Sequence, residues 1–469
     1  MTKKKKILLS LIGVLVALMG VAYIAVAVFF MGHFYSKTTV NGIDATYLGV
    51  DEVKKKVGDS VQDYTLAIKK IDDTTETLNA EQLQISFADD GEVDKLLKAQ
   101  KPWLWITEVF KNKNHELKVS INLSDEVLTS VVDGLDIMQE ANITTSQDAT
   151  IGQTETGFAI TPEVEGNQLN KEMVVETVKN AVLAGESEVN LAELGCYIKP
   201  NVYQDDEGLN NRLNHLNQLI SANLTIDFGS GRTETVNAAL LKDWITQDES
   251  GNDLIDSNQV AAYVNELADK YNTVGSTRTF TKTGGGTVKL SGGDYGWVLD
   301  VEATTANLAS AIAGGTQGEF EVTYTNSAKN RGSNDIGNSY VELSIDQQTM
   351  WCYVDGKLLV STPVVTGNVS KGWDTPKGGV WKVKGRRTNY TMTGKIDPAT
   401  GKPSYTAFCN YWIPYSEDLT IGLHDLTNRT SYGGNIYLTN GSHGCVNTPL
   451  DAVKQIYDVV AYGFPVVVY

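Results

Sequence analysis

The sequence predicts a multidomain protein with one N-terminal transmembrane helix, two α+β repeat domains and a mostly-β, β-sandwich-like C-terminal domain. Three observations predict it. A long apolar run follows a cluster of lysines, a short motif occurs twice in the middle of the chain, and short β-branched segments fill the last third. A chain of 469 residues also has room for about three folded domains outside a membrane.

The N-terminal element is predicted to be a membrane anchor. Lys3 to Lys6 are consecutive cations, and no charged residue occurs from Ile7 to Met31. A helix over that run would be roughly 37 Å long at about 1.5 Å per residue, enough to cross a bilayer. Because lysines favour the cytoplasmic side, everything after His33 should lie outside. A cleaved signal peptide is the alternative, since Ala25-Val26-Ala27 has the form of a cleavage site, but the length of the run favours an anchor.

The two repeats are predicted from a weak internal duplication. Residues 75–80 (TETLNA) recur as residues 233–238 (TETVNA), each after an alternating, strand-like run. Further on, helix-like stretches over 171–183 and 303–312 are each followed by a predicted strand, over 188–191 and 320–324. We therefore expect a cytoplasmic tail over 1–6, a transmembrane segment over 7–31, a stalk over 32–55, repeats over 56–200 and 201–330, a polar linker over 331–338 and the C-terminal domain over 339–469.

The C-terminal domain is predicted to consist mainly of strands. Its short β-branched or aromatic segments, separated by turn residues, are 341–345, 350–354, 358–360, 380–383, 436–438 and 465–469. A single helical pattern covers 449–460, with Thr448 as the expected N-cap and Pro449 at the first position. The expected fold is a sandwich-like one with one helix after Cys445.

Composition narrows the possible partners. The 39 basic and 57 acidic residues give a net charge of −18, which argues against nucleic acid, because binding phosphate requires a basic surface. The cysteines are Cys196, Cys352, Cys409 and Cys445, too few and too scattered for a disulfide framework. A Cys352–Cys409 bridge stays open.

The strongest chemical signal surrounds Cys445. A cysteine is a nucleophile as the thiolate, and an imidazole within reach is the usual way to form one near neutral pH. Two of the five histidines, His424 and His443, lie close to it in sequence. Gly444 allows a sharp turn in which successive N–H groups could stabilise an oxyanion. Spacing alone leaves buried structural residues or a zinc site as alternatives, although the ligand spacing of known closed zinc sites is absent.

The segment Ser442-His443-Gly444-Cys445-Val446-Asn447, with His424 upstream, resembles the signature of L,D-transpeptidases of the YkuD type, including the enterococcal enzymes. The resemblance extends over about residues 338–469. It includes Thr375-Pro376-Lys377-Gly378-Gly379. In the second repeat, residues 291–300 (SGGDYGWVLD) resemble domains that precede such catalytic domains and are named for peptidoglycan binding. Tyr295 and Trp297 there could stack on sugar rings or pack in a core, and the repeats could equally serve as spacers.

The resemblance implies a mostly-β catalytic fold and a peptidoglycan L,D-transpeptidase. Such an enzyme takes a tetrapeptide stem as donor, releases D-Ala, and passes a cysteinyl thioester to an acceptor amine, giving a 3→3 cross-link in cell-wall biogenesis that supports cell shape. The implied partners are peptidoglycan stem peptides, the cell membrane, and carbapenems, which connects the family to β-lactam resistance. No cofactor and no metal are expected. The catalytic domain should be extracellular on a single-pass protein.

Roles follow from the motif. Cys445 is the predicted nucleophile and His424 the general base, with His443 lining the site or acting as an alternative base. Gly444 contributes backbone to the oxyanion hole, and Ser442 orients an imidazole or caps the turn. Residues with possible substrate contacts are Asn447, Asp425, Tyr405, Trp412 and Tyr415. Asn447 stands where many relatives carry Arg, and Asp425 could orient an imidazole or be an ordinary exposed loop residue.

Three other functions compete with this one. An L,D-carboxypeptidase would use the same acyl-enzyme with water as acceptor. A sortase also combines an anchor with Cys and His, but no arginine follows Cys445. A non-enzymatic wall-binding protein would rely on its repeats and would have no need of the complete Cys445 motif.

Overall fold

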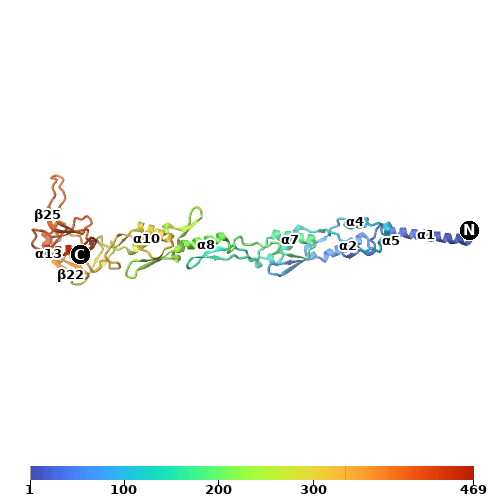
Figure 1. The fold of residues 1–469 in the computed structure, drawn as a ribbon, viewed down its shortest axis with the longest axis horizontal. Helices are drawn as coiled ribbons and strands as arrows, with labels where there is room; N and C mark the ends of the chain where they lie inside the picture. The colour runs from blue at the N-terminus through green and yellow to red at the C-terminus, as the bar shows by residue number, and fades with distance from the viewer. Residues whose placement is uncertain (1, 333) are drawn as a thin grey trace. The chain divides into compact units, whose positions relative to one another are not determined.

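The computed structural model describes residues 2–332 and 334–469. Met1, in the predicted cytoplasmic tail, and Ser333, in the predicted linker, lie outside the described residues. The chain forms two compact units (Figure 1): Met1–Thr150 with Ile160–Leu209, and Ile151–Ala159 with Asn210–Tyr469.

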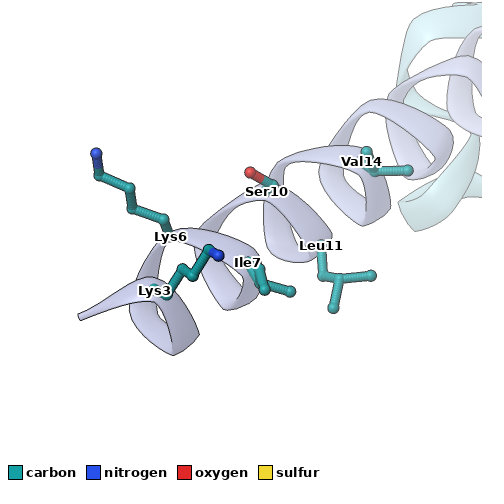
Figure 2. A pocket seen from close by; sticks show the side chains of 6 residues that line it. All are labelled: Lys3, Lys6, Ile7, Ser10, Leu11 and Val14. Atoms are coloured by element: carbon teal, nitrogen blue, oxygen red, sulfur yellow. The ribbon is translucent and has the colours of Figure 1, made fainter. Parts of the chain in front are cut away.

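Helix α1, Lys3–Phe29, opens the first unit. Within the described chain it is the one helix long and apolar enough to cross a membrane, and most of its side chains are exposed. Figure 2 shows its start, where Lys3 and Lys6 precede Ile7, Leu11 and Val14 on the same helix. The predicted apolar run is therefore helical over nearly its whole length, with the cations at the N-terminal end.

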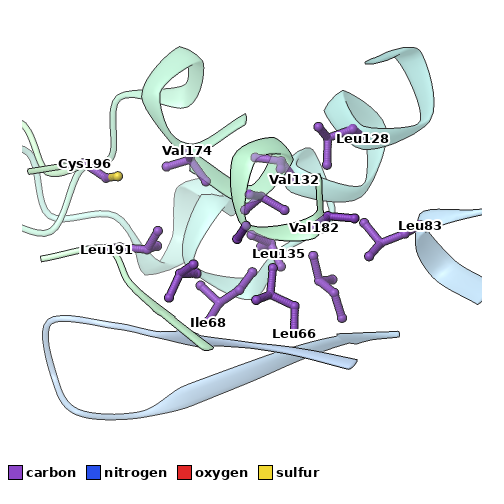
Figure 3. Packing of buried hydrophobic residues seen from close by; sticks show 14 of the residues in the cluster. Leu66, Ile68, Leu83, Leu128, Val132, Leu135, Val174, Val182, Leu191 and Cys196 are labelled. Carbon is purple, nitrogen blue, oxygen red and sulfur yellow. The ribbon is translucent and has the colours of Figure 1, made fainter. Parts of the chain in front are cut away.

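The rest of the first unit is an α+β fold around one apolar core. Figure 3 shows part of that core, where Leu66 and Ile68 from a strand pack beneath Val132 and Val182 from two helices. The elements are β1 (Thr38–Val40), β2 (Ile43–Asp44), α2 (Val50–Gln62), β3 (Thr65–Lys69), β4 (Thr75–Asn79), α3 (Ala80–Leu83), β5 (Ser86–Phe87), α4 (Glu92–Ala99), η1 (Pro102–Leu104), α5 (Trp105–Glu108), β6 (Lys113–His115), β7 (Ile121–Asn122), α6 (Asp125–Asp133), η2 (Asp136–Met138), η3 (Glu140–Asn142), α7 (Lys171–Ala184) and β10 (Glu188–Asn190).

The second unit begins with a similar α+β region. Its elements are β11 (Asn223–Asp227), β12 (Thr233–Val236), α9 (Ala238–Leu241), η4 (Lys242–Trp244), β13 (Ile245–Gln247), β14 (Asp253–Ile255), α10 (Ser257–Tyr271), β15 (Arg278–Thr281), β16 (Thr287–Leu290), β17 (Val298–Leu299), α11 (Val301–Ala313), β18 (Gln317–Glu319) and β19 (Tyr324–Asn326). The hairpin β8 (Thr150–Gln153) and β9 (Phe158–Thr161) and helix α8 (Glu207–Leu219) lie where the chain passes from one unit to the other.

Both regions contain a three-stranded sheet of the same topology. In the first, β3 pairs antiparallel with β4 and parallel with β10; in the second, β11 pairs antiparallel with β12 and parallel with β18. The two motifs that recur in the sequence form β4 and β12 with the turns after them. In each motif an asparagine, Asn79 or Asn237, accepts a backbone hydrogen bond at the N-terminus of the short helix that follows. The predicted strand 320–324 is wrong in position, because β18 ends at Glu319.

The C-terminal region is rich in β-structure, as predicted. A five-stranded sheet has the order β22-β21-β20-β28-β23, and a four-stranded sheet has the order β24-β25-β26-β27. Residues of both sheets and of α13 share one hydrophobic core. Figure 1 shows the β24–β25 hairpin projecting from this region. The elements are β20 (Tyr340–Ser344), β21 (Thr349–Val354), β22 (Lys357–Pro363), η5 (Val369–Lys371), β23 (Gly379–Lys382), β24 (Arg387–Thr393), β25 (Thr406–Pro414), β26 (Gly422–His424), α12 (Ile436–Asn440), β27 (Val446–Asn447), α13 (Leu450–Val459) and β28 (Pro465–Val468).

Two local predictions in this region are wrong. Residues 436–438 form the helix α12 instead of a strand, so a second helix precedes the cysteine. Helix α13 follows it as predicted, but Pro449 stands at the N-cap, and Thr448 donates its hydroxyl to Val446 O instead of capping the helix. All four cysteines are free thiols, so the possible Cys352–Cys409 bridge is absent.

The aromatic pair considered for sugar binding is partly in the core of the second unit. Tyr295 is fully buried, donates to Asp335 O and packs with Val380 and Val467. Asp335, in the predicted linker, is itself buried in an ion pair with Arg278. Tyr295 therefore has no surface on which a sugar could stack.

Candidate active site

Two short parallel strands position the candidate site. Strand β26 ends with His424, β27 begins directly after Cys445, and their pairing sets His424 opposite Asn447. Leu423 and Val446, the other pair in this register, are fully buried in the core of the domain. The register therefore brings the predicted base next to the segment of the predicted nucleophile, although 23 positions separate His424 from Asn447.

A tight turn leads into the cysteine. Gly444 has a φ of +115°, where a side chain would strain the backbone, and a Cβ there would lie 3.2 Å from Ile421 Cδ1. The Gly444 N–H donates to Ser442 Oγ at 3.0 Å, and Ser442 Oγ donates to Cys445 O at 2.5 Å. Ser442 thus caps the turn, and the Gly444 amide expected in the oxyanion hole is already hydrogen-bonded.

Thr375, which was not predicted as a site residue, holds the same turn. Its buried hydroxyl donates to Gly444 O at 2.7 Å and accepts from the Gly367 N–H at 2.9 Å. Because both bonds are short and buried, they fix the orientation of the peptide between Gly444 and Cys445. The signal for Thr375 in the sequence is its place in residues 375–379, which carry part of the family resemblance.

The thiol of Cys445 is buried and protonated at neutral pH. Only 7% of the residue is exposed, and its Sγ donates to Thr420 O at 3.4 Å. Burial raises the pKa of Cys445 to about 11; the Gly422 N–H opposes that rise and the charge of Asp418 adds to it. A base must therefore remove the proton before the sulfur can attack near pH 7.

His424 has the protonation state that such a base needs. Burial lowers the pKa of His424 to about 4, so the imidazole is neutral at pH 7. Its Nδ1 lies 2.8 Å from Asp425 O, and because a carbonyl only accepts, Nδ1 carries the proton. Nε2 is then the basic nitrogen, and it accepts from Asn447 Nδ2 at 3.1 Å. The described part of the chain has no hydrogen bond between this imidazole and Cys445 Sγ.

Two residues predicted to contact substrate are instead buried around His424. Asn447 donates to the imidazole, and its Oδ1 has no hydrogen-bond partner among the described residues. The Asp425 carboxylate accepts from the backbone N–H groups of Asn410 and Tyr411 and so braces β25. The alternative of an exposed loop residue for Asp425 is wrong, and it orients His424 through its backbone carbonyl.

His443 lies in an aromatic stack at the surface of the site. Its ring centre is 3.9 Å from that of Trp373 and 4.5 Å from that of Tyr405, with interplanar angles of 22° and 19°. Burial, and then the charge of Lys371, lower the pKa of His443. The two flanking rings restrict the movement of the imidazole. This is more typical of a residue that lines a site than of one that transfers protons. Trp373 is a further residue that was not predicted to line the site.

The three aromatic residues predicted near the site lie at different depths. Tyr405 is partly exposed against His443, whereas Trp412 is buried in a cluster with Cys445, and its ring centre lies 5.6 Å from that of His424. Tyr415 is completely buried, and its hydroxyl has no partner within residues 2–332 and 334–469. Of the three, Tyr405 alone offers a surface to a ligand.

The raised pKa of Cys445 predicts a steep pH dependence of its alkylation. Only the thiolate reacts, so below a pKa of about 11 the rate with iodoacetamide should rise about tenfold per pH unit between about pH 6 and pH 9. Peptide mass spectrometry would follow Cys445 separately from Cys352 and Cys409, whose pKa values burial raises to about 12 and which should react more slowly. A rate that is already constant at pH 6 would instead indicate a thiolate–imidazolium pair at rest.

Comparisons with known proteins match both parts of the chain. The YkuD family, the L,D-transpeptidase catalytic domain, matches residues 338–468. The domain family named for peptidoglycan binding matches residues 76–190 and 231–321. None of the curated protein sequences compared with the chain matches it.

Several solved structures of one enterococcal enzyme are similar. A cysteine-to-serine mutant of the Enterococcus faecium L,D-transpeptidase is 30% identical over 55% of this chain and 100% of that chain, with a TM-score of 0.46. The avibactam carbamoyl enzyme of Ldtfm is 30% identical over 56% of this chain and 99% of that chain, with a TM-score of 0.47. The catalytic domain from the E. faecium enzyme, acylated by ertapenem, is 36% identical over 28% of this chain and 98% of that chain, with a TM-score of 0.25. Because the sequence identity extends over the whole enterococcal chain, and both domain families match in the same chain, this protein belongs to the L,D-transpeptidases with a YkuD catalytic domain and N-terminal peptidoglycan-binding domains.

Proposed function

We propose that this protein forms 3→3 cross-links in peptidoglycan through a thioester on Cys445. The main support for the proposal is the pairing of β26 with β27. This pairing brings the neutral, oriented imidazole of His424 next to the chain segment that contains the buried thiol of Cys445. The substrate is the tetrapeptide stem that L,D-transpeptidases use. The ertapenem-acylated enterococcal relative supports an acyl-enzyme, because acylation requires a nucleophile in the catalytic domain.

The first half-reaction transfers the acyl group to sulfur. Cys445 Sγ attacks the carbonyl carbon of the third stem residue while its proton passes to His424 Nε2. The C–N bond to D-Ala then breaks, and the same proton leaves on the D-Ala amine. For Nε2 to accept the proton, it must exchange its bond with Asn447 Nδ2 for one with Sγ–H. The carbonyl of Asp425 keeps Nδ1 protonated and stabilises the imidazolium that forms.

The second half-reaction releases the acyl group. An acceptor amine attacks the thioester carbonyl, gives a proton to His424 Nε2, and the thiolate leaves and regains a proton. The charge on the carbonyl oxygen needs backbone N–H donors in both steps. The amides of Gly444 and Cys445 are our candidates. The Gly444 amide must first leave Ser442 Oγ, so substrate binding and adjustment of the turn are expected to be coupled.

We further propose that α1 is an uncleaved anchor, with the catalytic domain outside the cell. A signal peptidase requires an accessible backbone after Ala27, but this alanine is completely buried within the last turns of α1. Phe30, three residues further on, is also buried, against Tyr35 and Trp105. The last turns of α1 are therefore part of a folded domain. We propose the repeat domains over 56–200 and 201–330 as the connection between this anchor and the enzyme.

The function is tested by incubating the detergent-solubilised full chain with a disaccharide-tetrapeptide and weighing the products. We expect a dimer whose mass equals two substrates less one alanine. A tripeptide product with no dimer would identify an L,D-carboxypeptidase. Unchanged substrate that nevertheless binds would favour a wall-binding protein without catalysis.

A further inference from the structure

Residues 102–110 form a short apolar segment at the end of α1. Helices η1 and α5 occupy it, and the sequence around it, KPWLWITEVFKNK over 101–113, has lysines at both ends. Four large apolar side chains lie exposed close together in the sequence: Trp103 by 50%, Leu104 by 49%, Ile106 by 51% and Phe110 by 75%. A contiguous exposed patch of this kind marks an interaction surface.

Hydrogen bonds fix this segment along the last turns of α1. The Trp105 indole Nε1–H donates to Tyr23 O at 3.2 Å, and the Tyr23 hydroxyl donates to Trp103 O. The side-chain amide of Gln100, at the end of α4, donates to Phe30 O at 3.2 Å and His33 O at 3.0 Å. The bond to Phe30 O satisfies a carbonyl that the end of α1 leaves free, and together these bonds hold the segment against the last turns of the helix.

The bond to Tyr23 sets the depth of the segment in a membrane. About 20 residues of helix span the hydrocarbon core, and the charge-free run extends from Ile7 to Met31. Any 20 consecutive residues chosen from this run include Tyr23. The Trp105 indole, which bonds to the Tyr23 carbonyl, must then lie at the level of the outer hydrocarbon and not in the water above it.

The chemistry of the segment suits that depth. Tryptophan is enriched where the hydrocarbon meets the headgroups, because its ring is apolar and its N–H is polar. Lys101 at one end of the segment can reach the phosphate groups. Glu108, the acidic residue of the segment, is paired with Lys111 at 2.7 Å and with Lys113 at 2.5 Å. Beside the segment an open cleft of about 680 Å³ is lined mainly by apolar side chains, among them Val26, Phe29 and Phe110.

We propose that residues 102–110 are a membrane-docking surface that lies in the outer leaflet, with Trp103, Leu104, Ile106 and Phe110 among the acyl chains. The lipid bilayer is the partner, and the cleft beside α1 holds acyl chains. This inference rests on the proposed anchor and is independent of the chemistry at Cys445. On this proposal the first unit rests directly on the membrane, because η1 and α5 lie beside α1 in the bilayer.

Tryptophan quenching by brominated lipid tests this proposal. The full chain would be reconstituted in phosphatidylcholine–phosphatidylglycerol vesicles with brominated or ordinary acyl chains, and vesicle flotation would report whether the anchor holds. The chain has eight tryptophans, of which Trp103 and Trp105 belong to the segment. Bromine quenches on contact, so the wild-type protein should lose up to about a quarter of its emission. The Trp103→Phe/Trp105→Phe variant should lose almost none, whereas the matched control Trp373→Phe should lose as much as the wild type.

The outcomes separate the docking surface from the anchor. Flotation with quenching that depends on Trp103 and Trp105 supports both. Flotation of the wild type without bromine-dependent quenching overturns the docking surface and leaves the anchor standing. Protein that does not float with the vesicles overturns both, whatever its activity on peptidoglycan.

Discussion

Cys445→Ser should reduce L,D-transpeptidase turnover by roughly three orders of magnitude or more. A serine hydroxyl is far less acidic than a thiol, and the site that already raises the pKa of Cys445 to about 11 would keep the hydroxyl protonated. Turnover would be measured by mass spectrometry of the products from a disaccharide-tetrapeptide. A carbapenem should add one covalent mass to the wild-type protein and none to Cys445→Ser, because its strained carbonyl requires the same nucleophile.

The other three cysteines provide matched controls. Cys409 is the sharpest, since it lies in the same buried cluster as Cys445 but donates its thiol to Tyr390 O at 3.4 Å. Cys409→Ser, Cys352→Ser and Cys196→Ser should retain the carbapenem adduct and most of the turnover. If a folded Cys409→Ser protein lost its adduct while Cys445→Ser kept one, the nucleophile would be Cys409.

The main features of the fold could be predicted because they depend on local patterns. The apolar run from Ile7 to Met31, and five of the six segments predicted as strands in the C-terminal domain, depend on hydrophobicity and on β-branched residues. The same criterion wrongly predicted a strand at 436–438. Its residues favour a strand, but Gly433 and Gly434 adopt left-handed φ values of +81° and +60°, and the chain turns into the short helix α12 next to η5.

The hairpin of β24 and β25 was not predicted, because local sequence patterns do not show it. Strands β24 and β25 pair with each other over Arg387–Trp412, and β25 also pairs with β26. The residues of β24 are largely polar, and the apolar residues of β25 do not alternate with polar ones. What makes them strands is pairing between segments that the sequence alone does not connect. Such non-local contacts override weak intrinsic preferences.

For the candidate site, the sequence identified the chemistry better than the supporting contacts. The motif around Cys445 and the upstream His424 could be read directly. The bond from Thr375 to Gly444 O and the stack of Trp373 on His443 arise from a loop about 70 positions earlier, so spacing gave no sign of them. Asn447 was predicted as a possible substrate contact, but its buried amide donates to His424 instead.

The two histidines near Cys445 should respond very differently to substitution. His424 has an oriented tautomer and a basic Nε2, whereas the His443 ring is stacked between Trp373 and Tyr405. General-base catalysis by a positioned imidazole is worth about 10²- to 10⁴-fold. We therefore expect His424→Ala to lower the rate of acylation by a carbapenem by about that factor at pH 7. His443→Ala should weaken substrate binding with a smaller effect on the acylation rate at saturation.

A pH profile separates loss of the base from loss of structure in His424→Ala. Without an imidazole, hydroxide must remove the thiol proton, so acylation of the variant should recover as the pH rises toward the pKa of Cys445, about 11. In the wild type, a bound carbapenem should let the neutral His424 exchange its bond with Asn447 for one with the thiol, so acylation, unlike alkylation of the unliganded protein, should depend little on pH above about 6. A variant that is merely distorted would stay slow at every pH. If His443→Ala showed the alkaline recovery and His424→Ala retained wild-type rates at pH 7, the base would be His443, and the contact between His424 and Asn447 would be purely structural.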